Sequence, residues 1–578
     1  MYDPAALPGF LAAVGDIPGV HGRTGDGPPR SVLRRGPVTL VTWGVEAVPG
    51  DPDAFALSRV LRDADGAVAV ETAAGRMRVD PRSVTGMLPP FAAVAAGESS
   101  VTMVADSMGF RQLFHSGASD ARDGVLSTSA LLAGWTRGAG LDEIAVAVQS
   151  LLGWQLGQRT LHDGVVKLTP GAAATLDHGG VVVDEQPDAA VDPIGLDDAV
   201  TAAAEILRAS LDALIHDHPE AVLQLTGGMD SRVLLAAIPS ERRRGLRAMT
   251  LGAPGDGDVR IAARIATEQG LRHEVYRPAE LSDVDPAEAW AQCRVAALRL
   301  DGLADPLTLA VLGRDERSFD QGVRIAGLGG EVARGFYYLG AVRDHPVTAA
   351  EASRLGAWRM FANESIEPGV LTDEFSAWAR DAAEKELLKA LQDGSPEWFH
   401  ATDALYLRHR MQRWAGATDT AVAYQRLVIN PMLDERFLAI AGRLRPQDKA
   451  GARFLARLLL RLDPQLGSIG LEGRLSPSAY ASPGPWQAIA GKALIARKLA
   501  RKTLQRVRGA NRAPDGVVVF ADKVVEHWRA DTALLEPLAA TGFVREDWVD
   551  GVRSGRIRPR PSSVGFLTNV LVASRPLV

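Results

Sequence analysis

The chain has 578 residues, more than one hydrophobic core usually supports, so we expect two large domains. Its 46% hydrophobic residues, 23% charged residues and net charge of -6 are those of an ordinary globular protein, and they exclude extensive disorder and a mainly nucleic-acid-binding role. A single cysteine excludes a disulfide framework, and the lack of a signal segment or a long apolar run predicts a cytoplasmic protein without integral membrane association.

Short apolar runs separated by glycine, aspartate and proline follow one another from residue 38 to about residue 184. This pattern predicts strands joined by turns. The polar, proline-bearing stretch 185–193 predicts a linker, and we place the domain boundary between residues 190 and 191. Apolar residues at helical spacing then predict a helix over 196–218.

The second domain alternates predicted strands and helices. Strands are expected at 221–225, 247–251, 273–276 and 323–326, with helices after Asp230 and over 259–269. Such alternation predicts a parallel sheet with helices on both faces. From residue 350 onward we expect a mostly helical chain.

A glycine turn joins the first of these strands to the following helix, in the order Thr226-Gly227-Gly228-Met229-Asp230-Ser231. Paired glycines let the backbone approach an anion closely, and the helix N-terminus adds amide donors and a favourable dipole. Two hydroxyl groups and one carboxylate, a ligand that Mg²⁺ prefers, flank the turn. The loop therefore predicts a site for a pyrophosphate group, and the alternative is a plain strand-to-helix turn with Asp and Ser as caps.

Six segments in the same order resemble motifs of the asparagine synthetase family. They are Asp106-Ser107-Met108-Gly109-Phe110-Arg111-Gln112-Leu113-Phe114, Lys167-Leu168-Thr169-Pro170-Gly171, the loop from Thr226 to Ser231, Leu251-Gly252 with Asp258, Ala326-Gly327-Leu328-Gly329-Gly330-Glu331, and Asn430-Pro431-Met432-Leu433-Asp434. The resemblance implies an α/β protein with two domains. The first, over 1–190, is a glutaminase-like (Ntn-type) antiparallel α/β sandwich. The second, over 191–578, is a doubly wound parallel-sheet ATP-pyrophosphatase domain with a helical C-terminal part.

The same resemblance implies the residues of the site. It assigns ATP binding to Leu225, Thr226, Gly227, Gly228, Met229, Asp230, Ser231, Thr250, Leu251, Gly252, Asp258, Gly327, Leu328, Gly329 and Gly330. It assigns catalytic roles to Asp230, Ser231, Glu331, Arg453 and Arg474, and the binding of Mg²⁺ to Asp230 and Glu331. Glu331 stands where the family has aspartate, and the two arginines stand where it has lysines that neutralise pyrophosphate.

The chain departs from the family at three positions that carry chemistry. Tyr2 replaces the cysteine with which glutamine-using members release ammonia, so glutamine hydrolysis by that route is excluded. Leu328 stands at the position of the family's base, and Leu427 stands at the glutamate that partners a tyrosine base in beta-lactam synthetases. An amine that is readily deprotonated, such as a peptide N-terminus, needs a base least.

A chain of about this length that lacks the cysteine and has Gly329-Gly330-Glu331 in the second motif resembles the lasso peptide macrocyclases. The implied reaction is adenylation of an Asp or Glu side chain in a linear core peptide, followed by attack of the peptide's N-terminal amine, with release of AMP and pyrophosphate. A leader-peptide-binding protein and a leader peptidase are the implied partners. A small-molecule ligase of the same family and a non-catalytic ATP-binding scaffold are the alternatives.

Two further segments have local patterns. The stretch 491–514 carries eight basic and no acidic residues, which predicts a basic amphipathic helix whose polar face is either solvated or a surface for a partner. Phe336, Tyr337 and Tyr338 follow Glu331 on what we expect to be one helix, and core packing is the favoured interpretation of these aromatic residues over substrate stacking.

Overall fold

The computed structural model describes residues 7–17, 30–58, 61–117, 124–185, 192–319, 322–338, 341–361, 364–423, 425–472, 474–482 and 515–574. Tyr2, most of the expected linker and the basic segment 491–514 lie outside these ranges. Within them, no helix has the length and apolar character needed to cross a membrane.

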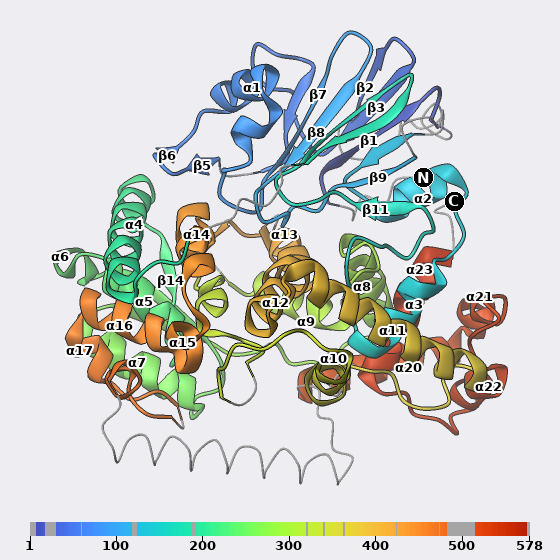
Figure 1. The fold of residues 1–578 in the computed structure, drawn as a ribbon. Coiled ribbons are helices and arrows are strands. Elements are labelled where there is room, and N and C mark those ends of the chain that lie inside the picture. The colour runs from blue at the N-terminus through green and yellow to red at the C-terminus, as the bar shows by residue number, and fades with distance from the viewer. Residues whose placement is uncertain are drawn as a thin grey trace.

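Two antiparallel sheets form the upper part of the molecule in Figure 1. In spatial order, the six-stranded sheet contains β11 (Val165–Lys167), β9 (Phe114–Ser116), β10 (Val125–Ser127), β1 (Gly9–Val14), β3 (Val38–Trp43) and β2 (Arg30–Arg35). The five-stranded sheet contains β13 (Gly180–Asp184), β12 (Ala173–Asp177), β8 (Val101–Ala105), β7 (Ala92–Ala96) and β4 (Ala54–Ala56). A small pair, β5 (Arg62–Asp63) and β6 (Gly66–Ala67), follows β4 in the chain.

The two sheets pack face to face around an apolar layer. Phe10 and Leu40 of the first sheet share one buried cluster with Val94 and Met103 of the second. On the outer faces, α2 (Ala130–Arg137) packs against the first sheet and α1 (Val70–Val79) against the second. The predicted antiparallel sandwich is therefore present, with helices outside both sheets.

The sequence pattern did not predict the helices within residues 38–184. Besides α1 and α2, this part contains α3 (Glu143–Leu152) and a 3-10 turn, η1 (Pro81–Val84). Helix α3 is buried on nearly every side, from Ala145 to Ser150. Because a short, continuous apolar run has no amphipathic period, periodicity alone cannot distinguish such a helix from a buried strand.

A third sheet of five parallel strands forms the centre of the following part. In spatial order it contains β16 (Arg272–Tyr276), β15 (Arg247–Leu251), β14 (Val222–Gln224), β17 (Arg324–Ile325) and β18 (Val428–Ile429). The first four confirm the predicted strands. Strand order reverses on the two sides of β14, and ligands of open α/β sheets bind at such a switch point, beyond the carboxyl ends of the strands.

The helices of this part surround the sheet. They are α4 (Leu196–Asp217), α5 (Asp230–Ala237), α6 (Ser240–Arg243), α7 (Gly257–Gln269), α8 (Pro286–Arg299) and α9 (Pro306–Arg317). Leu223 of β14 joins the main core, which includes the buried faces of α4 and α5, whereas Val222 packs with Met249 and Phe319 in a separate small core. These clusters place helices against the face that contains Leu223, whereas Phe319, just after α9, covers the opposite face at Val222. The predicted helices on both faces are thus seen in these contacts for one face.

The rest of the chain is mostly helical, as expected from residue 350 onward. Its helices are α10 (Ala349–Leu355), α11 (Asp373–Gly394), α12 (Trp398–Leu405), α13 (Ala417–Ala423), α14 (Glu435–Arg443), α15 (Pro446–Lys449), α16 (Arg453–Leu462), α17 (Pro464–Ser468), α18 (Pro477–Ala481), α20 (Asp515–Ala530), α21 (Glu536–Ala539), α22 (Glu546–Arg553) and α23 (Pro561–Ser574). Two π-helices, η3 (Gly356–Met360) and η4 (Tyr406–Gly416), and short 3-10 turns, η2 (Gly330–Arg334), η5 (Pro431–Leu433), η6 (Ala450–Ala452) and η7 (Thr532–Leu535), complete the fold.

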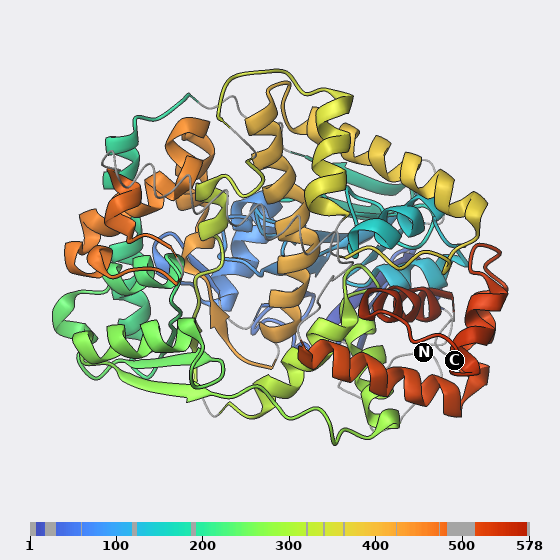
Figure 2. The ribbon, with the colours of Figure 1, turned by 90° about the horizontal axis from the view of Figure 1, so that it is seen from below.

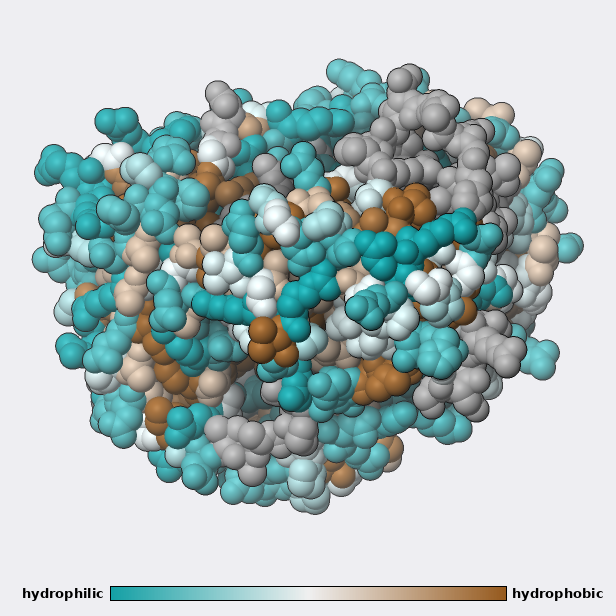
Figure 3. Space-filling model, turned by 90° about the horizontal axis from the view of Figure 1, so that it is seen from above, coloured by the Kyte–Doolittle hydropathy of each residue, from teal (hydrophilic) through white to brown (hydrophobic). Residues whose placement is uncertain are grey.

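The helical part spreads beneath the sandwich. Figures 1 and 2 both place α14 to α17 (orange) on one side of the molecule and α20 to α23 (red) on the other, with α12 and α13 between them. Viewed from above, hydrophilic residues cover most of the surface and apolar residues form small separate patches (Figure 3). Isolated apolar patches of this kind are ordinary for a protein surface.

The sandwich and the helical part meet in a buried polar interface. The Lys167 ammonium donates to the side chain of Gln412 at 2.9 Å, and its side chain is almost fully buried. Burial and the neighbouring Arg413 guanidinium lower the pKa of Lys167 to about 7, against a partial opposing effect of Asp106.

The lowered pKa of Lys167 makes the free energy of unfolding depend on pH. Unfolding returns Lys167 to its ordinary pKa of 10.5, so between about 7 and 10.5 the unfolded chain binds more protons than the folded chain. One such group adds a rise in the free energy of unfolding of up to about 1.4 kcal/mol per pH unit over that window. We expect Lys167→Met to remove this contribution, measured as the urea midpoint of variant and parent between pH about 7.5 and about 9.5. Parallel pH profiles for the two proteins would contradict the assignment.

Candidate functional site

The loop after β14 lies at the switch point of the parallel sheet and begins α5. The Leu225 amide donates to the Met249 carbonyl at 2.8 Å, which continues the sheet by one residue before the chain turns. The Ser231 hydroxyl then accepts the Thr226 amide at 3.1 Å and lies 3.2 Å from the Thr226 hydroxyl, which accepts the Gly228 amide at 3.1 Å. Both hydroxyls therefore shape the loop from within, while the first turn of α5 has no side-chain cap.

Two glycines are required for close approaches around this loop. A Cβ on Gly227 would lie 2.6 Å from Asp258 Oδ1, and a Cβ on Gly330 would lie 2.4 Å from Asp230 Oδ1. Both distances are shorter than any ordinary contact between a carbon and an oxygen atom. Gly227 thus allows Asp258, in the first turn of α7, to contact the loop. Gly330 allows the segment after β17 to pack closely against the start of α5.

Two carboxylates and one guanidinium meet at this junction. Arg334 Nη1 lies 3.4 Å from Asp230 Oδ2, and Arg334 Nη2 donates to Glu331 Oε1 at 3.0 Å. The Asp230 side chain is only 17% exposed. Burial raises the pKa of Asp230 and the nearby Glu331 raises it further, whereas Arg334 and Arg474 lower it. The cluster therefore carries a net charge of about -1 when both carboxylates are ionised.

The donor chemistry of the two carboxylates suits a divalent cation. Asp230 Oδ1 and Glu331 Oε2 are both buried and accept no hydrogen bond in the described part of the chain. A buried carboxylate oxygen without a donor is costly, and oxygen ligands of this kind are those that Mg²⁺ prefers. Asp230 and Glu331 could together hold Mg²⁺, with Arg334 as the remaining counter-charge.

A pocket of about 500 Å³ opens beside this cluster. It is lined by Gly227, Gly228, Met229, Asp230, Asp258, Arg334, Gly451, Ala452, Leu471, Glu472, Arg474 and Tyr480. Gly451 and Ala452 adopt left-handed backbone conformations just before α16, whose first turn also has no side-chain cap. The N-terminal ends of two helices, α5 and α16, therefore border the pocket together with Arg334 and Arg474, an arrangement suited to an anion.

Arg232 connects two walls of the pocket. Its side chain is fully buried, and Nη2 donates to the carbonyls of Gly227 at 3.0 Å and Gly470 at 2.8 Å, while Nη1 donates to the Ile469 carbonyl. Burial lowers the pKa of Arg232 to about 10. One side chain thus fixes the glycine loop against the segment that carries Leu471, Glu472 and Arg474.

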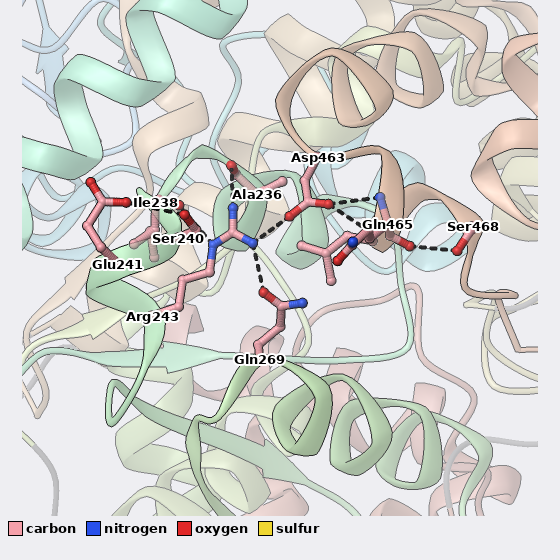
Figure 4. Close-up of polar contacts among 10 residues, drawn as sticks. Ala236, Ile238, Ser240, Glu241, Arg243, Gln269, Asp463, Gln465 and Ser468 are labelled. Carbon is pink, nitrogen blue, oxygen red and sulfur yellow. Dashed lines mark hydrogen bonds and ion pairs between the residues drawn. The ribbon is translucent and has the colours of Figure 1, made fainter.

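A second buried arginine braces the other end of α5 (Figure 4). Arg243 donates to the Ala236 carbonyl at 3.1 Å and to Gln269 Oε1 at 2.8 Å, and it forms an ion pair with Asp463. The Asp463 carboxylate in turn caps α17 through the Gln465 amide at 2.9 Å. This network joins α5 and α6 to α7, α16 and α17 away from the pocket.

The residues predicted to bind ATP at the end of β15, Thr250, Leu251 and Gly252, lie outside the pocket lining. Thr250 is fully buried, and its hydroxyl donates to the Leu225 carbonyl at 2.7 Å and lies 2.8 Å from His273 Nε2. The Gly252 amide donates to the Tyr276 carbonyl at 2.9 Å. Thr250, Leu251 and Gly252 do not line the pocket described above, and Thr250 and Gly252 use the named groups to hold the sheet together.

Other predicted residues divide between the pocket and its surroundings. Arg474 lines the pocket, whereas Arg453 pairs with Asp448 at 3.4 Å and remains 45% exposed. Leu328 packs against the main core, and Leu427 lines a separate small cavity of about 30 Å³ beneath the sandwich. Sequence reasoning did not identify Arg334, Glu472 or Tyr480 as pocket residues. Arg334 could have been predicted as a neighbour of Glu331, because residues three positions apart lie on one face of a helix.

The aromatic residues after Glu331 do not share its helix. The 3-10 turn Gly330–Arg334 ends at Gly335, which has φ 62°, and the chain then changes direction. Tyr337 is 3% exposed, and Phe336 stacks on Tyr406 with ring centroids 4.4 Å apart. The expectation of one continuous helix is therefore wrong, because a left-handed residue ends the turn, while core packing of these rings is confirmed.

Comparison with known proteins gives little further information. No protein-family description matches the sequence, and no curated protein matches it. A solved structure titled "Structure of the allosteric regulatory enzyme of purine biosynthesis" is similar over 55% of this chain and 88% of that chain, with 10% sequence identity and a TM-score of 0.20. A likeness at this TM-score carries no argument about the fold or the function.

Proposed function

We propose that the protein is an ATP-dependent, AMP-forming amide ligase that closes a macrolactam ring in a ribosomal peptide. The observation that carries the proposal is a pair of carboxylates with buried, unpartnered oxygens, Asp230 and Glu331, which Arg334 joins. Asp230 and Arg334 line a pocket bordered by a glycine turn and two helix N-termini. Pairs of oxygen ligands next to such anion-binding backbone are typical of nucleotide phosphate sites.

The pocket suits a triphosphate whose outer phosphates leave. The uncapped first turns of α5 and α16 offer backbone donors, and Arg334 and Arg474 add positive charge. When bound, Mg²⁺ supplies charge that offsets the negative charge building on the departing pyrophosphate. Asp230 and Glu331 would hold it, and Gly227 and Gly228, which line the pocket, would let the backbone lie close to the phosphates.

The proposed reaction has two balanced steps. A side-chain carboxylate oxygen of the peptide attacks the α-phosphorus of ATP, and the bond to pyrophosphate breaks. The N-terminal amine nitrogen then attacks the acyl carbon, the bond to AMP breaks, and the amine proton passes to solvent. A free carboxylate is a poor acyl donor at neutral pH, so the first step supplies the leaving group that the second step needs.

The residue at the position of the family's base favours orientation over proton transfer as the source of rate. Leu328, at the position of the family's base, packs into the apolar core and cannot accept a proton. A peptide N-terminal amine has a pKa of about 8, so a substantial fraction is already deprotonated near neutral pH. The proposed enzyme therefore gains rate mainly by holding amine and acyl group together. A leader-peptide-binding protein and a leader peptidase would deliver the linear peptide.

The nucleotide products test the proposal. The purified protein is incubated with ATP, Mg²⁺ and linear peptides that carry an Asp or Glu side chain and a free N-terminus, and nucleotides and peptide masses are followed together. We expect AMP and pyrophosphate to form in step with a peptide product that has lost one water.

Other outcomes separate the competing functions. Formation of ADP, or no binding of ATP, would overturn the proposal. AMP that forms only with free amino acids would replace it by a small-molecule ligase. Binding of ATP without turnover under every condition would favour a scaffold.

A further inference from the structure

The π-helix η4 (Tyr406–Gly416) lies between the N-terminal sandwich and the proposed site. Eleven residues of π-helix between α12 and α13 are unusual, since π geometry normally occurs as single-turn bulges and is frequent at functional sites. Met411, Gln412 and Arg413 in its centre are almost fully buried. Its wide turn must therefore be held by neighbours on more than one side.

One face of η4 is bonded to the N-terminal part of the chain. Arg413 is fully buried, and it donates from Nε to the Gly157 carbonyl at 2.9 Å, from Nη2 to the Arg159 carbonyl at 2.6 Å and from Nη1 to Gln112 Oε1 at 3.2 Å. Gln112 Nε2 donates to the Gln412 carbonyl at 3.0 Å, and the Gly157 amide donates to His409 Nδ1 at 3.1 Å. All acceptors of Arg413 are neutral, so its role there is to join backbone segments and not to neutralise a carboxylate.

The start of η4 contacts the segment that follows Arg334 of the proposed site. Tyr406 stacks on Phe336 at 4.4 Å between ring centroids and lies edge-on to Tyr337 at 5.8 Å. Arg359 donates to the Phe336 carbonyl at 3.0 Å and fixes this segment from its other side. Phe336 follows Arg334 by two residues, and Arg334 contacts both Asp230 and Glu331. A continuous series of contacts therefore runs from the sandwich to the two carboxylates.

We propose that the N-terminal domain serves as a clamp for this π-helix, and that Arg413 is a positioning residue which, through Tyr406 and Phe336, keeps the turn Gly330–Arg334 closed on Asp230. The sandwich thus contributes to the site without chemistry of its own. The structural part of this inference stands independently, and only its effect on catalysis rests on the proposed function.

The test compares the removal of two contacts between the same two parts of the protein. Arg413→Met removes the clamp, and Arg62→Met is the matched control, because buried Arg62 pairs with Asp217 of α4 and is not among the contacts of η4 named above. Gln112→Ala is a milder clamp variant, should Arg413→Met fail to fold, since it removes one acceptor of Arg413 and the donor to Gln412.

Hydrogen exchange and kinetics give separate readouts. We expect amides in residues 330–338 and 406–416 to exchange hydrogen at least about tenfold faster in Arg413→Met than in the parent. In the control Arg62→Met, the exchange rates of these two segments should equal those of the parent. The kcat of ATP–pyrophosphate exchange should fall about tenfold or more, with the KM for ATP within about threefold. Gln112→Ala should also raise the hydrogen-exchange rates and lower the kcat, each by a smaller amount.

Hydrogen exchange tests the positioning role of Arg413, and ATP–pyrophosphate exchange tests the proposed function. Unchanged exchange in 330–338 for both clamp variants, or equal acceleration in Arg62→Met, would overturn the positioning role. If the parent protein shows no ATP–pyrophosphate exchange, the proposed function fails while hydrogen exchange still decides whether the clamp exists.

Discussion

Asp230→Asn should lower the rate of ATP–pyrophosphate exchange by about 100-fold or more, because it removes a charged oxygen ligand where negative charge develops on the leaving pyrophosphate. Glu331→Gln should have an effect of similar size, since its unpartnered oxygen complements that of Asp230. Neither substitution should lower the free energy of unfolding much. Asp230 is a buried carboxyl whose pKa burial raises, so a neutral side chain of the same shape removes a cost of desolvation.

A matched control exists elsewhere in the fold. Asp301 is also buried, burial raises its pKa to about 7, and it accepts the Ser129 hydroxyl. Neither Asp301 nor Ser129 lines the pocket. Asp301→Asn should leave the exchange rate within about threefold of the parent. Exchange that survives in Asp230→Asn, with thermal unfolding unchanged, would show that the pocket beside α5 is not the site of adenylation.

Arg232→Met is expected to raise the KM for ATP about tenfold or more and to lower the free energy of unfolding by about 2–4 kcal/mol. The reason is geometric. Arg232 satisfies three carbonyls at once and fixes the glycine loop to the segment after Ile469, so its loss leaves buried acceptors unpaired and lets the two walls of the pocket separate. Arg232→Lys keeps the charge but cannot reach three carbonyls, and it should fall between parent and Arg232→Met.

The second brace of α5 separates this effect from simple loss of stability. Arg243→Met breaks a comparable buried network at the far end of the same helix (Figure 4). We expect it to lower the urea midpoint while leaving the KM for ATP within about threefold. An increase in KM of equal size in both variants would mean that Arg232 acts through the general stability of α5 and not through the pocket.

Features encoded by neighbouring residues were predicted well. The strands near 222, 247, 272 and 324, and the helices α4, α5 and α7, follow from runs whose period and bounding glycines lie within a few residues. Helix α3 was not predicted, because its short, buried apolar run has no period that distinguishes a helix from a strand. The end of the turn at Gly335 was also missed, since nothing in the sequence requires a left-handed residue there.

Local sequence alone establishes that a buried strand, a glycine turn and a helix start follow one another at residues 222–231, because hydrogen bonding and the conformational freedom of glycine act between adjacent residues. It also offered Glu331 as a partner for Asp230, by resemblance alone. Three features emerge in the folded protein alone. Arg334 contacts Asp230 as well as Glu331, Gly451 and Ala452 bring a second helix start to the pocket, and η4 contacts both the sandwich and the segment after Arg334. Apart from Glu331 and Arg334, which are three positions apart, these contacts join residues tens to hundreds of positions apart. Such proximity is set by the order of parallel strands and by core packing, which no local pattern contains.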